Sequence, residues 1–284
     1  AKGALLLEPT RSNLITYSND FSSSGYVTPN YGTSPEGLSV SRVLFTGTNQ
    51  VFGGNTSLAT GVVSNFSAYV KGIQGELIRF ACGGQDISHT FSGEWERLSG
   101  SRTSINNSWN LNTFGGATAR DFLLCGAQLE QGSYATSYIP TQGSAVTRSA
   151  DVCNNGGNEQ VINSTEGVLY AEISGFENDT SFRTISLSDG SNINEVQLLY
   201  SGNTNIIRVI LTSNAVTQVD FNYTMTNGVN YNKIAFTYKQ NNFQLWVNGI
   251  KRQSDTIGNT SNNLNKIRFQ NGVGSANFYG NVKD

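Results

Sequence analysis

The side chains that could do acid–base chemistry are few. His89 is the only histidine among the 284 residues, and Glu94 and Glu96 follow it in the stretch GEWERLSG. Residues two apart on a strand share a face at about 6.5 Å, a separation that paired glycosidase carboxylates use. The third acid that would continue the alternation is missing, because Leu98 holds that position, and Arg97 can pair with either glutamate. Since no nucleophile stands in a suitable setting near His89, we expect no enzymatic activity.

Metal chemistry has an equally weak signature. Cys82, Cys125 and Cys153 are widely spaced and odd in number, so we expect reduced thiols, at least two of them in strands, rather than a disulfide framework or a zinc site. Calcium needs no compact motif, since carboxylates and loop carbonyls can bind it. A structural calcium ion therefore stays an alternative, and its candidate ligands are Asp20, Asp121, Asp179 and Asp189.

The composition restricts the class of partner. Charged residues make up 13% of the chain and the formal net charge is -2, whereas globular domains average about 25% charged residues. The polar surface must then come mainly from Asn, Ser, Thr, Gln and Gly, which suits neutral, hydroxyl-rich ligands. We expect no nucleic-acid partner, because no basic cluster is present, and no membrane insertion, because no run approaches about 18 apolar residues.

Aromatic residues on such a surface are candidates for stacking against sugar rings. Trp246 alternates with Leu245 and Val247 and should face away from the core that they fill. Trp109 lies among polar residues in NNSWNLN and is expected to be exposed, whereas Trp95 opens a strand and is expected in the core. The candidate glycan-binding residues are Trp246, Trp109, Tyr26, Tyr31, Asn232 and Gln244.

The elements that must position these residues are strands. Alternation with a period of two appears in NFSAYVK, VLYAEI, KIAFTY and NFQLWVNG, and Asn248-Gly249 is typical of a two-residue hairpin turn. We expect an all-β protein of two tandem antiparallel sandwiches. The first should cover residues 1–150 and the second residues 164–284. The polar, Gly-rich segment 151–163 between them should be a protease-sensitive linker.

Four phrases resemble bacteriophage tail fibre, tailspike and head-fibre proteins, in the order in which they occur there. They are GALLLEPTRSNLITYSNDFS, SPEGLSVSRV, NFSAYVKG and GEWERLSG. The stretch GAQLEQGSYATSYIPTQGSAVTR (residues 126–148) is similar to that family's closing phrase. The resemblance implies a carbohydrate-binding-module-like jelly roll. It also implies that residues 126–148 end the last strand of this jelly roll and lead the chain toward the next module. In that structural role Glu130 and Arg148 would anchor the segment and Pro140 would stiffen it. Gly25-Tyr26 replaces a tryptophan of the family pattern, and FLLCGAQLE lacks an aspartate that binds calcium in related modules.

The second half resembles a concanavalin-A-like, laminin-G-type sandwich. STEGVLYAEI is similar to its first strand and NKIAFTYKQNNFQLWVNGIKR to a hairpin of that family. FYGNVKD resembles the start of its closing strand, so we expect the chain to be a fragment truncated in that strand.

Together the resemblances imply a non-catalytic receptor-attachment segment of a phage virion fibre or spike. It would be assembled in the bacterial cytoplasm, could form a trimer in the full-length protein, and would bind a cell-surface polysaccharide. One alternative is a pair of binding modules on a secreted, extracellular polysaccharide-degrading enzyme. Another is a structural virion decoration without a ligand.

Overall fold

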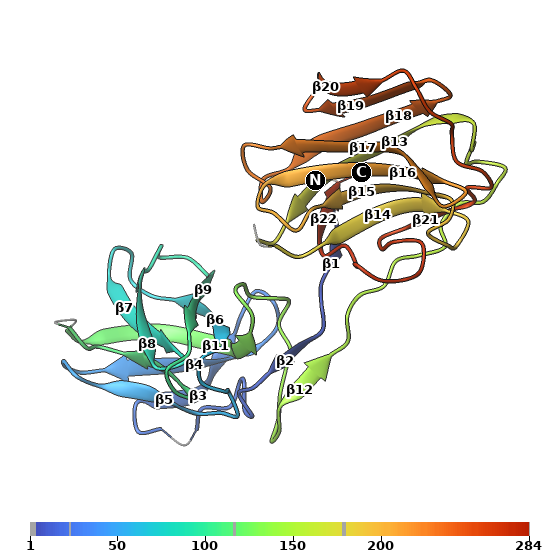
Figure 1. Cartoon of the computed structure of the whole chain (residues 1–284). Helices are drawn as coiled ribbons and strands as arrows, with labels where there is room; N and C mark the ends of the chain where they lie inside the picture. The colour runs from blue at the N-terminus through green and yellow to red at the C-terminus, as the bar shows by residue number, and fades with distance from the viewer. Residues whose placement is uncertain (1–3, 23, 116–117, 178–179, 284) are drawn as a thin grey trace. The chain divides into compact units, whose positions relative to one another are not determined.

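The computed structural model describes residues 4–22, 24–115, 118–177 and 180–283. These residues form strands, turns and loops with no helix, and all pairings between the strands are antiparallel, which confirms the predicted all-β class. The chain forms two compact units (Figure 1). We call Thr10–Ser149 the inserted sandwich and Ala1–Pro9 together with Ala150–Asp284 the split sandwich.

The inserted sandwich has a five-stranded sheet in the order β3-β4-β11-β6-β9 and a four-stranded sheet in the order β5-β10-β7-β8. The strands of the larger sheet are β3 (Val27–Thr33), β4 (Ser39–Phe45), β6 (Val63–Lys71), β9 (Glu96–Thr103) and β11 (Arg120–Gln131). The strands of the smaller sheet are β5 (Val51–Asn55), β7 (Leu77–Cys82), β8 (Gln85–Thr90) and β10 (Ser108–Asn112). A short sheet pairs β2 (Arg11–Asn13) with β12 (Val146–Arg148).

The split sandwich has a six-stranded sheet in the order β1-β22-β13-β18-β19-β20 and a five-stranded sheet in the order β17-β16-β15-β14-β21. The strands of the six-stranded sheet are β1 (Ala4–Leu7), β13 (Glu166–Gly175), β18 (Asn232–Lys239), β19 (Asn242–Val247), β20 (Ile250–Asp255) and β22 (Gly280–Lys283). The strands of the five-stranded sheet are β14 (Arg183–Ser188), β15 (Glu195–Tyr200), β16 (Ile206–Ser213), β17 (Val216–Thr224) and β21 (Lys266–Arg268).

Each sandwich has its own apolar core, built from the alternate residues of facing sheets. In β19 the residues Phe243, Leu245 and Val247 are buried in the core of the split sandwich. In β6 the residues Phe66, Ala68 and Val70 are buried in the core of the inserted sandwich. The alternation read from the sequence therefore assigned the inward face of both strands correctly.

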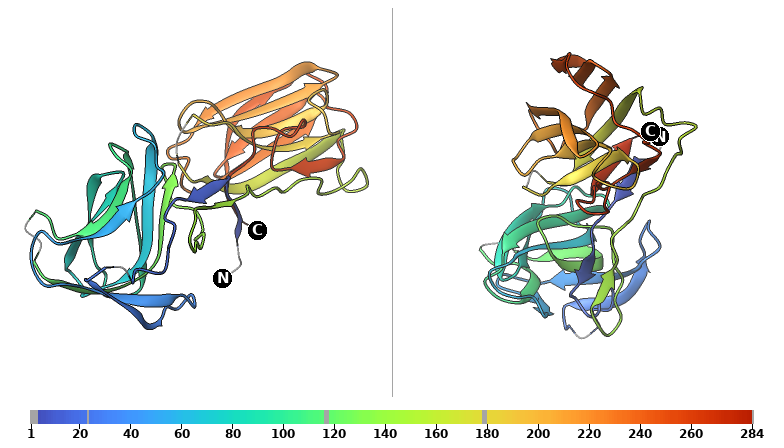
Figure 2. Two further views of the ribbon diagram at one scale, coloured as in Figure 1. Left: turned by 90° about the horizontal axis from the view of Figure 1, so that it is seen from below. Right: turned by 45° about the vertical axis from the view of Figure 1, so that its right-hand side comes forward.

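The first strand does not belong to the unit that follows it in sequence. β1 pairs with β22, and Leu7 is 4% exposed within the core of the split sandwich (Figures 1 and 2). The structure thus places the boundary differently from the expected domain of residues 1–150. In the sequence, the segment that forms the inserted sandwich interrupts the segment that forms the split sandwich. The chain therefore passes from one unit to the other twice, at Pro9–Thr10 and at Ser149–Ala150.

The segment expected to be a linker packs on the split sandwich. Gly156 exchanges two backbone hydrogen bonds with Ile267, at 3.1 and 2.6 Å, and the amide of Phe269 donates to the carbonyl of Cys153 at 2.9 Å. The side chains of Cys153 and Ile162 contact the core. Residues 151–163 are therefore a tethered part of that unit rather than a free connection.

Residues 126–148 close the inserted sandwich. Glu130 is fully buried and accepts a hydrogen bond from the amide of Thr136 at 3.0 Å, and Gln128 accepts one from the amide of Ile139 at 2.6 Å. The side chain of Asn13, from the start of the unit, donates to the carbonyls of Ala127 and Ile139. The residues that follow β11 thus fold back over that strand and are held to it by hydrogen bonds.

The asparagine–glycine hairpin between β19 and β20 forms as predicted. Asn248 and Gly249 have φ angles of 52° and 79°, which this tight turn requires, and Val247 pairs with Ile250. The side chain of Asn248 also accepts a hydrogen bond from the amide of Lys233 at 2.8 Å. The turn is thereby tied to the neighbouring strand.

Candidate functional site

Trp246 lies on the outer face of the six-stranded sheet, as its alternation with buried residues predicts. It is half-buried, and its neighbours across the sheet are Ala235 in β18 and Lys251 in β20. Ala235 in turn pairs with Tyr170 of β13, which is 53% exposed. Two aromatic residues therefore flank a small alanine in one cross-strand row, which we call the aromatic row.

Side-chain hydrogen bonds hold the polar residues beside this row. The indole Nε1 of Trp246 donates to Oε1 of Gln244 at 3.1 Å, and Nε2 of Gln244 donates to Oδ1 of Asn242 at 3.1 Å. All three side chains lie on the outer face of β19, because they alternate with its buried residues. The hydrogen bond between Trp246 and Gln244 fixes how the indole ring is oriented.

A shallow hollow of about 310 Å³ lies on the same face next to these residues. Val168, Thr237 and Asn242 contribute to its lining, together with an ion pair of 2.9 Å between Lys239 and Glu166. The hydrogen bond to Glu166 raises the pKa of Lys239 above its ordinary value. The outer face therefore offers apolar, hydroxyl, amide and charged groups within one small area.

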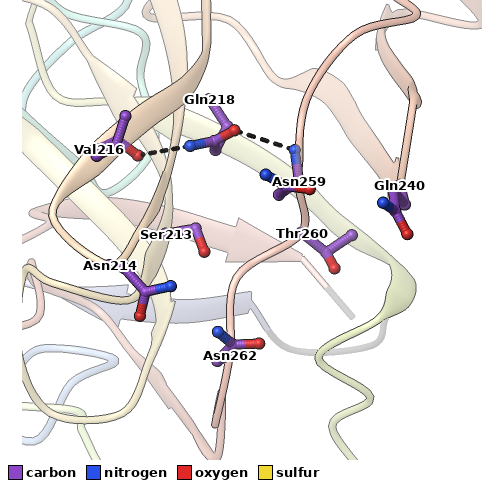
Figure 3. A pocket seen from close by; sticks show the side chains of 8 residues that line it. All are labelled: Ser213, Asn214, Val216, Gln218, Gln240, Asn259, Thr260 and Asn262. Carbon is purple, nitrogen blue, oxygen red and sulfur yellow. Dashed lines mark hydrogen bonds between the residues drawn. The ribbon is translucent and has the colours of Figure 1, made fainter.

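A second cavity, of about 400 Å³, lies at one end of the split sandwich (Figure 3). Three chain segments line it: the β16–β17 turn with the strand residues beside it, the β18–β19 turn and the loop after β20. Its lining residues are Ser213, Asn214, Val216, Gln218, Gln240, Asn259, Thr260 and Asn262. None of these eight residues carries a charge. We call this cavity the amide pocket.

Hydrogen bonds from one lining residue, Gln218, and from residues beside the pocket hold its walls in place. Gln218 connects two of the segments, since its Nε2 donates to the carbonyl of Val216 at 3.3 Å and its Oε1 accepts from the amide of Asn259 at 3.0 Å (Figure 3). Ser261, which is buried, donates to the carbonyl of Thr212 at 2.8 Å, and Asn241 accepts from the amide of Gly258 at 3.1 Å. The loop after β20 is therefore fixed at three points.

Most of the pocket's remaining side chains have no hydrogen-bond partner among the described residues. The amide groups of Asn214, Gln240 and Asn262 make no hydrogen bond to any residue that the structure describes, and neither does the hydroxyl of Thr260. Ser213, Asn214, Thr260 and Asn262 are arranged around one space in Figure 3. The pocket thus gathers donors and acceptors that only solvent or a ligand can satisfy.

The expectation that Trp109 is exposed is wrong. Its side chain is 6% exposed and packs in the core of the inserted sandwich, with its ring stacked on Phe66 at 5.5 Å and edge-on to Phe52 at 5.6 Å. The polar neighbours in NNSWNLN misled the interpretation. The alternation of Trp109 with Leu111 in β10, both buried, was the signal that could have corrected it.

Asn232 is not placed to contact a ligand either. It is 5% exposed, and its Nδ2 donates to the carbonyls of Asn227 and Asn230 at 2.9 and 2.8 Å. Its Oδ1 accepts from Nδ2 of Asn248 at 3.0 Å. Asn232 therefore shapes the turn before β18, and its hydrogen-bonding capacity is used within the protein.

The remaining aromatic candidates divide by burial. Tyr26 packs against the core of the inserted sandwich, with its ring edge-on to Phe45 at 5.3 Å. Tyr31 is 53% exposed and lies far from the aromatic row in sequence, within the other sandwich. Trp95, expected in the core, is only half-buried and directly precedes β9.

Glu94 and Glu96, the two carboxylates considered as a catalytic pair, do not lie on one strand. β9 begins at Glu96, so Glu94 lies outside the strand and the two carboxylates do not have strand spacing. Glu94 contacts Lys71 at 3.3 Å, while Glu96 accepts from the amide of Ser92 at 2.7 Å and lies 3.4 Å from His89. The two acids thus have separate structural partners, and the absence of enzymatic activity stays a prediction.

Among the described residues, no three His, Cys, Asp or Glu side chains are grouped as a metal site would require. Asp121 pairs with Arg42, and Asp20 accepts from the amide of Ser22. Burial raises the pKa of Asp189, but hydrogen bonds from Ser191 and Asn194 outweigh it and hold that pKa below its ordinary value. Asp179 lies outside the described residues, so the calcium prediction remains untested there.

The thiols agree with expectation. Cys82 and Cys125 are free, buried and located in β7 and β11, and Cys153 is free and half-buried. Burial raises the pKa of Cys125 to about 11, which keeps this thiol protonated and unreactive at neutral pH.

The split sandwich also contains candidate site residues that the sequence interpretation missed. Tyr170 could have been found from VLYAEI, where it alternates with Leu169 and Ala171. The amide-pocket residues gave no such signal, because they come from turns and a loop whose polar residues resemble any other surface segment.

No protein-family model matches the chain, and no curated protein matches its sequence. Among solved structures, one similar chain is the mouse laminin alpha1 chain, domains LG4-5, at 12% identity and a TM-score of 0.32. The superposition covers 99% of this chain and 89% of that chain. It is too loose to indicate a ligand, and it adds nothing to the all-β class that the chain's own sheets establish. In the described residues no helix is long and apolar enough to cross a membrane.

Proposed function

We propose that the split sandwich binds a neutral, hydroxyl-rich glycan, with the amide pocket as its main site. The observation that carries this proposal is the set of amide and hydroxyl side chains that face a cavity of about 400 Å³ without partners in the described chain. The volume lies within the range of about 300–1,000 Å³ that is usual for small-ligand sites. With an uncharged lining, the pocket favours a ligand that donates and accepts hydrogen bonds but carries no charge.

The chemistry of a sugar matches such a lining. Each sugar hydroxyl both donates and accepts a hydrogen bond, and an asparagine or glutamine side chain does the same. Individual bonds of this kind contribute only about 0.5–1.5 kcal/mol, since both partners give up water. A single site should therefore bind weakly, and repeated copies of the protein would raise the avidity by effective concentration.

The aromatic row offers a continuation of this site along β19. Gln240 lies in the turn before the strand, and Asn242, Gln244 and Trp246 follow on its outer face. At about 3.3 Å per residue, the path from Gln240 to Trp246 is roughly 20 Å, a length that a short oligosaccharide can span. We therefore assign Trp246 and Tyr170 as stacking surfaces for sugar units beyond the pocket.

The biological setting that we propose is receptor attachment by a phage virion fibre or spike. Its support is the series of sequence phrases in residues 3–151, while the pocket supports only the binding step. A binding module attached to a secreted polysaccharide-degrading enzyme is the second candidate, because the same neutral pocket would serve it. Measurable glycan binding would argue against a third candidate, a structural decoration without a ligand.

The test is a glycan array probed with the full chain, followed by affinity measurements on variants. Asn262→Ala and Gln240→Ala should each weaken binding to a neutral oligosaccharide that the array identifies, while the thermal midpoint stays unchanged because both residues are exposed. Asn203→Ala, an exposed asparagine in the β15–β16 turn, is the matched control. An affinity equal to that of the wild type in both pocket variants would refute the assignment.

A further inference from the structure

The inserted sandwich carries an exposed tyrosine that an irregularity in its strand directs outward. The register between β3 and β4 shifts between Thr28 and Gly32, so that Pro29, Asn30 and Tyr31 stand opposite Ser41 alone. Asn30 has a φ of 56°, and its Oδ1 accepts a hydrogen bond from the hydroxyl of Ser39 at 3.1 Å. Bulges of this kind redirect side chains and are frequent beside binding sites. This bulge places the ring of Tyr31 over the guanidinium of Arg42, with 5.6 Å from Cζ to the ring centroid.

Arg42 is held in a fixed orientation. Its Nε and Nη2 donate to the two carboxylate oxygens of Asp121, at 2.8 and 2.5 Å. Nη1 of Arg42 has no acceptor among the residues that the structure describes, and the side chain is 34% exposed. One edge of a positioned guanidinium is thus available to an acceptor from outside.

A second cation lies close to the first. Lys71, on the outer face of β6, pairs with Leu123 of β11, which pairs in turn with Arg42 of β4. The partner of Lys71 is Glu94 at 3.3 Å, whose side chain is 85% exposed. Such an exposed pair contributes little, so an incoming carboxylate can replace Glu94 at low cost.

These groups line a single hollow of about 290 Å³. Its lining consists of Tyr31, Arg42, Lys71, Gly72, Ile73, Asp121, Phe122 and Leu123. Two of these residues are cationic and one is anionic, which leaves one positive charge in excess, and Ile73 adds an apolar side chain that is 61% exposed. The hollow thus combines an aromatic ring, an apolar rim and two cations, of which Lys71 is paired with the exposed Glu94 outside the lining.

We propose that this hollow is a second glycan site, specific for an acidic sugar unit such as a hexuronic acid. The sugar carboxylate accepts hydrogen bonds from Nη1 of Arg42 and from Nζ of Lys71, in place of Glu94. The apolar face of the sugar ring packs on Tyr31 and Ile73. This site is independent of the amide pocket, since it lies in the other sandwich and takes the opposite class of sugar, one with a charge.

Charge selectivity is the property that distinguishes this assignment. Hydrogen bonds to a charged group contribute more than neutral ones, so a carboxylate should improve binding about 10-fold or more over the matching alcohol. The advantage should shrink as salt is added, because the site is partly exposed and screening acts on it. The amide pocket has no charged lining and should show neither effect.

The experiment compares three forms of one oligosaccharide on the full chain by isothermal titration or NMR shifts. They are a form containing glucuronic acid, its carboxyl-reduced counterpart, and a form with a phosphate ester in place of the carboxylate. The first should bind about 10-fold tighter than the second in low salt. Tyr31→Ala should weaken binding of both, and Lys71→Met should reduce the preference for the acid, because Arg42 remains. The control Tyr17→Ala, another exposed tyrosine of the same sandwich, should leave binding unchanged.

Three results would overturn the proposal: no binding of the acid form at millimolar concentration, equal binding of the acid and reduced forms, or wild-type binding in both Tyr31→Ala and Lys71→Met. Tight binding of the phosphate form alone would overturn the assignment to a carboxylate. Loss of neutral-glycan binding in Asn262→Ala tests the amide pocket separately, so failure of one site is distinguishable from failure of the other.

Discussion

The two sandwiches present cavities of opposite chemistry. The amide pocket of the split sandwich gathers uncharged amides and hydroxyls from turns and a loop, whereas the hollow beside Tyr31 combines an aromatic ring with two cations on the face of a sheet. Both sandwiches bury alternate residues of antiparallel strands. The shared fold class therefore does not set the chemistry of the two cavities, which depends on turns, loops and one bulge.

The two units also differ in how the chain builds them. The inserted sandwich is continuous in sequence, while the split sandwich needs both ends of the chain, since β1 pairs with β22. Each unit nevertheless has a separate core. Changes in one core should then leave the other unaffected, as is usual for distant sites without shared partners.

The largest effect should come from the buried tryptophan. Trp109→Ala removes a ring stacked on Phe66 and should destabilise the inserted sandwich by about 3–5 kcal/mol, the usual cost of such a truncation. Hydrogen exchange resolved to peptides from each sandwich measures this cost, and the split sandwich should keep its protection. Equal loss of protection in both would show that the two cores unfold together.

The first strand gives the corresponding test of the split sandwich. Leu7→Ala should destabilise that unit by about 2–5 kcal/mol, because Leu7 is 4% exposed in its core, while peptides from Thr10–Ser149 stay protected. Leu5→Ala is the matched control, since Leu5 is 43% exposed and should change stability little. Destabilisation of the inserted sandwich instead would contradict the assignment of β1.

Trp246 should behave in the opposite way to Trp109. Trp246→Ala should weaken binding of an extended neutral glycan about 10-fold, in keeping with the loss of an aromatic contact of about 1–2 kcal/mol. The thermal midpoint should change little, because the indole lies outside the core. An unaltered affinity for every oligosaccharide that the pocket binds would remove the aromatic row from the site.

The smallest effect concerns two matched ion pairs, Arg42–Asp121 in the inserted sandwich and Arg208–Asp220 in the split one. The hydrogen bond from each arginine holds the pKa of its aspartate below the ordinary value. Each pair therefore stabilises the fold above the unfolded pKa of about 3.9, and this contribution is lost as pH falls through the folded pKa.

Replacing either aspartate should weaken the dependence of stability on pH in the acid range, and only for the sandwich that contains that aspartate. For Asp220→Asn the loss at neutral pH should be below about 1 kcal/mol, since the pair is partly exposed and solvent screens it. Acid titration followed by NMR signals from each unit checks the direction for both pairs. A weaker pH dependence of stability in the sandwich without the substitution would mean that the two units are coupled.

Local sequence patterns determined the strands and most of their inward faces. NFQLWVNG predicted both the burial of Phe243, Leu245 and Val247 and the outward position of Trp246, and Asn248-Gly249 predicted its turn. These features follow from a period of two and from the backbone angles of single residues, which neighbours in sequence decide. Trp109 shows the limit, because polar neighbours suggested exposure where the same alternation indicated burial.

Only the tertiary structure decided which distant segments meet. Ala4 pairs with Lys283 at the other end of the chain, and the amide pocket draws on turns and a loop between residues 213 and 262. Pairing between chain ends leaves no local pattern, since any alternating strand can satisfy any edge of suitable register. Polar loop residues likewise look alike until the fold brings them around one space. The sequence thus determined the class of fold and the kind of surface, while the domain boundary and both candidate sites depended on long-range contacts.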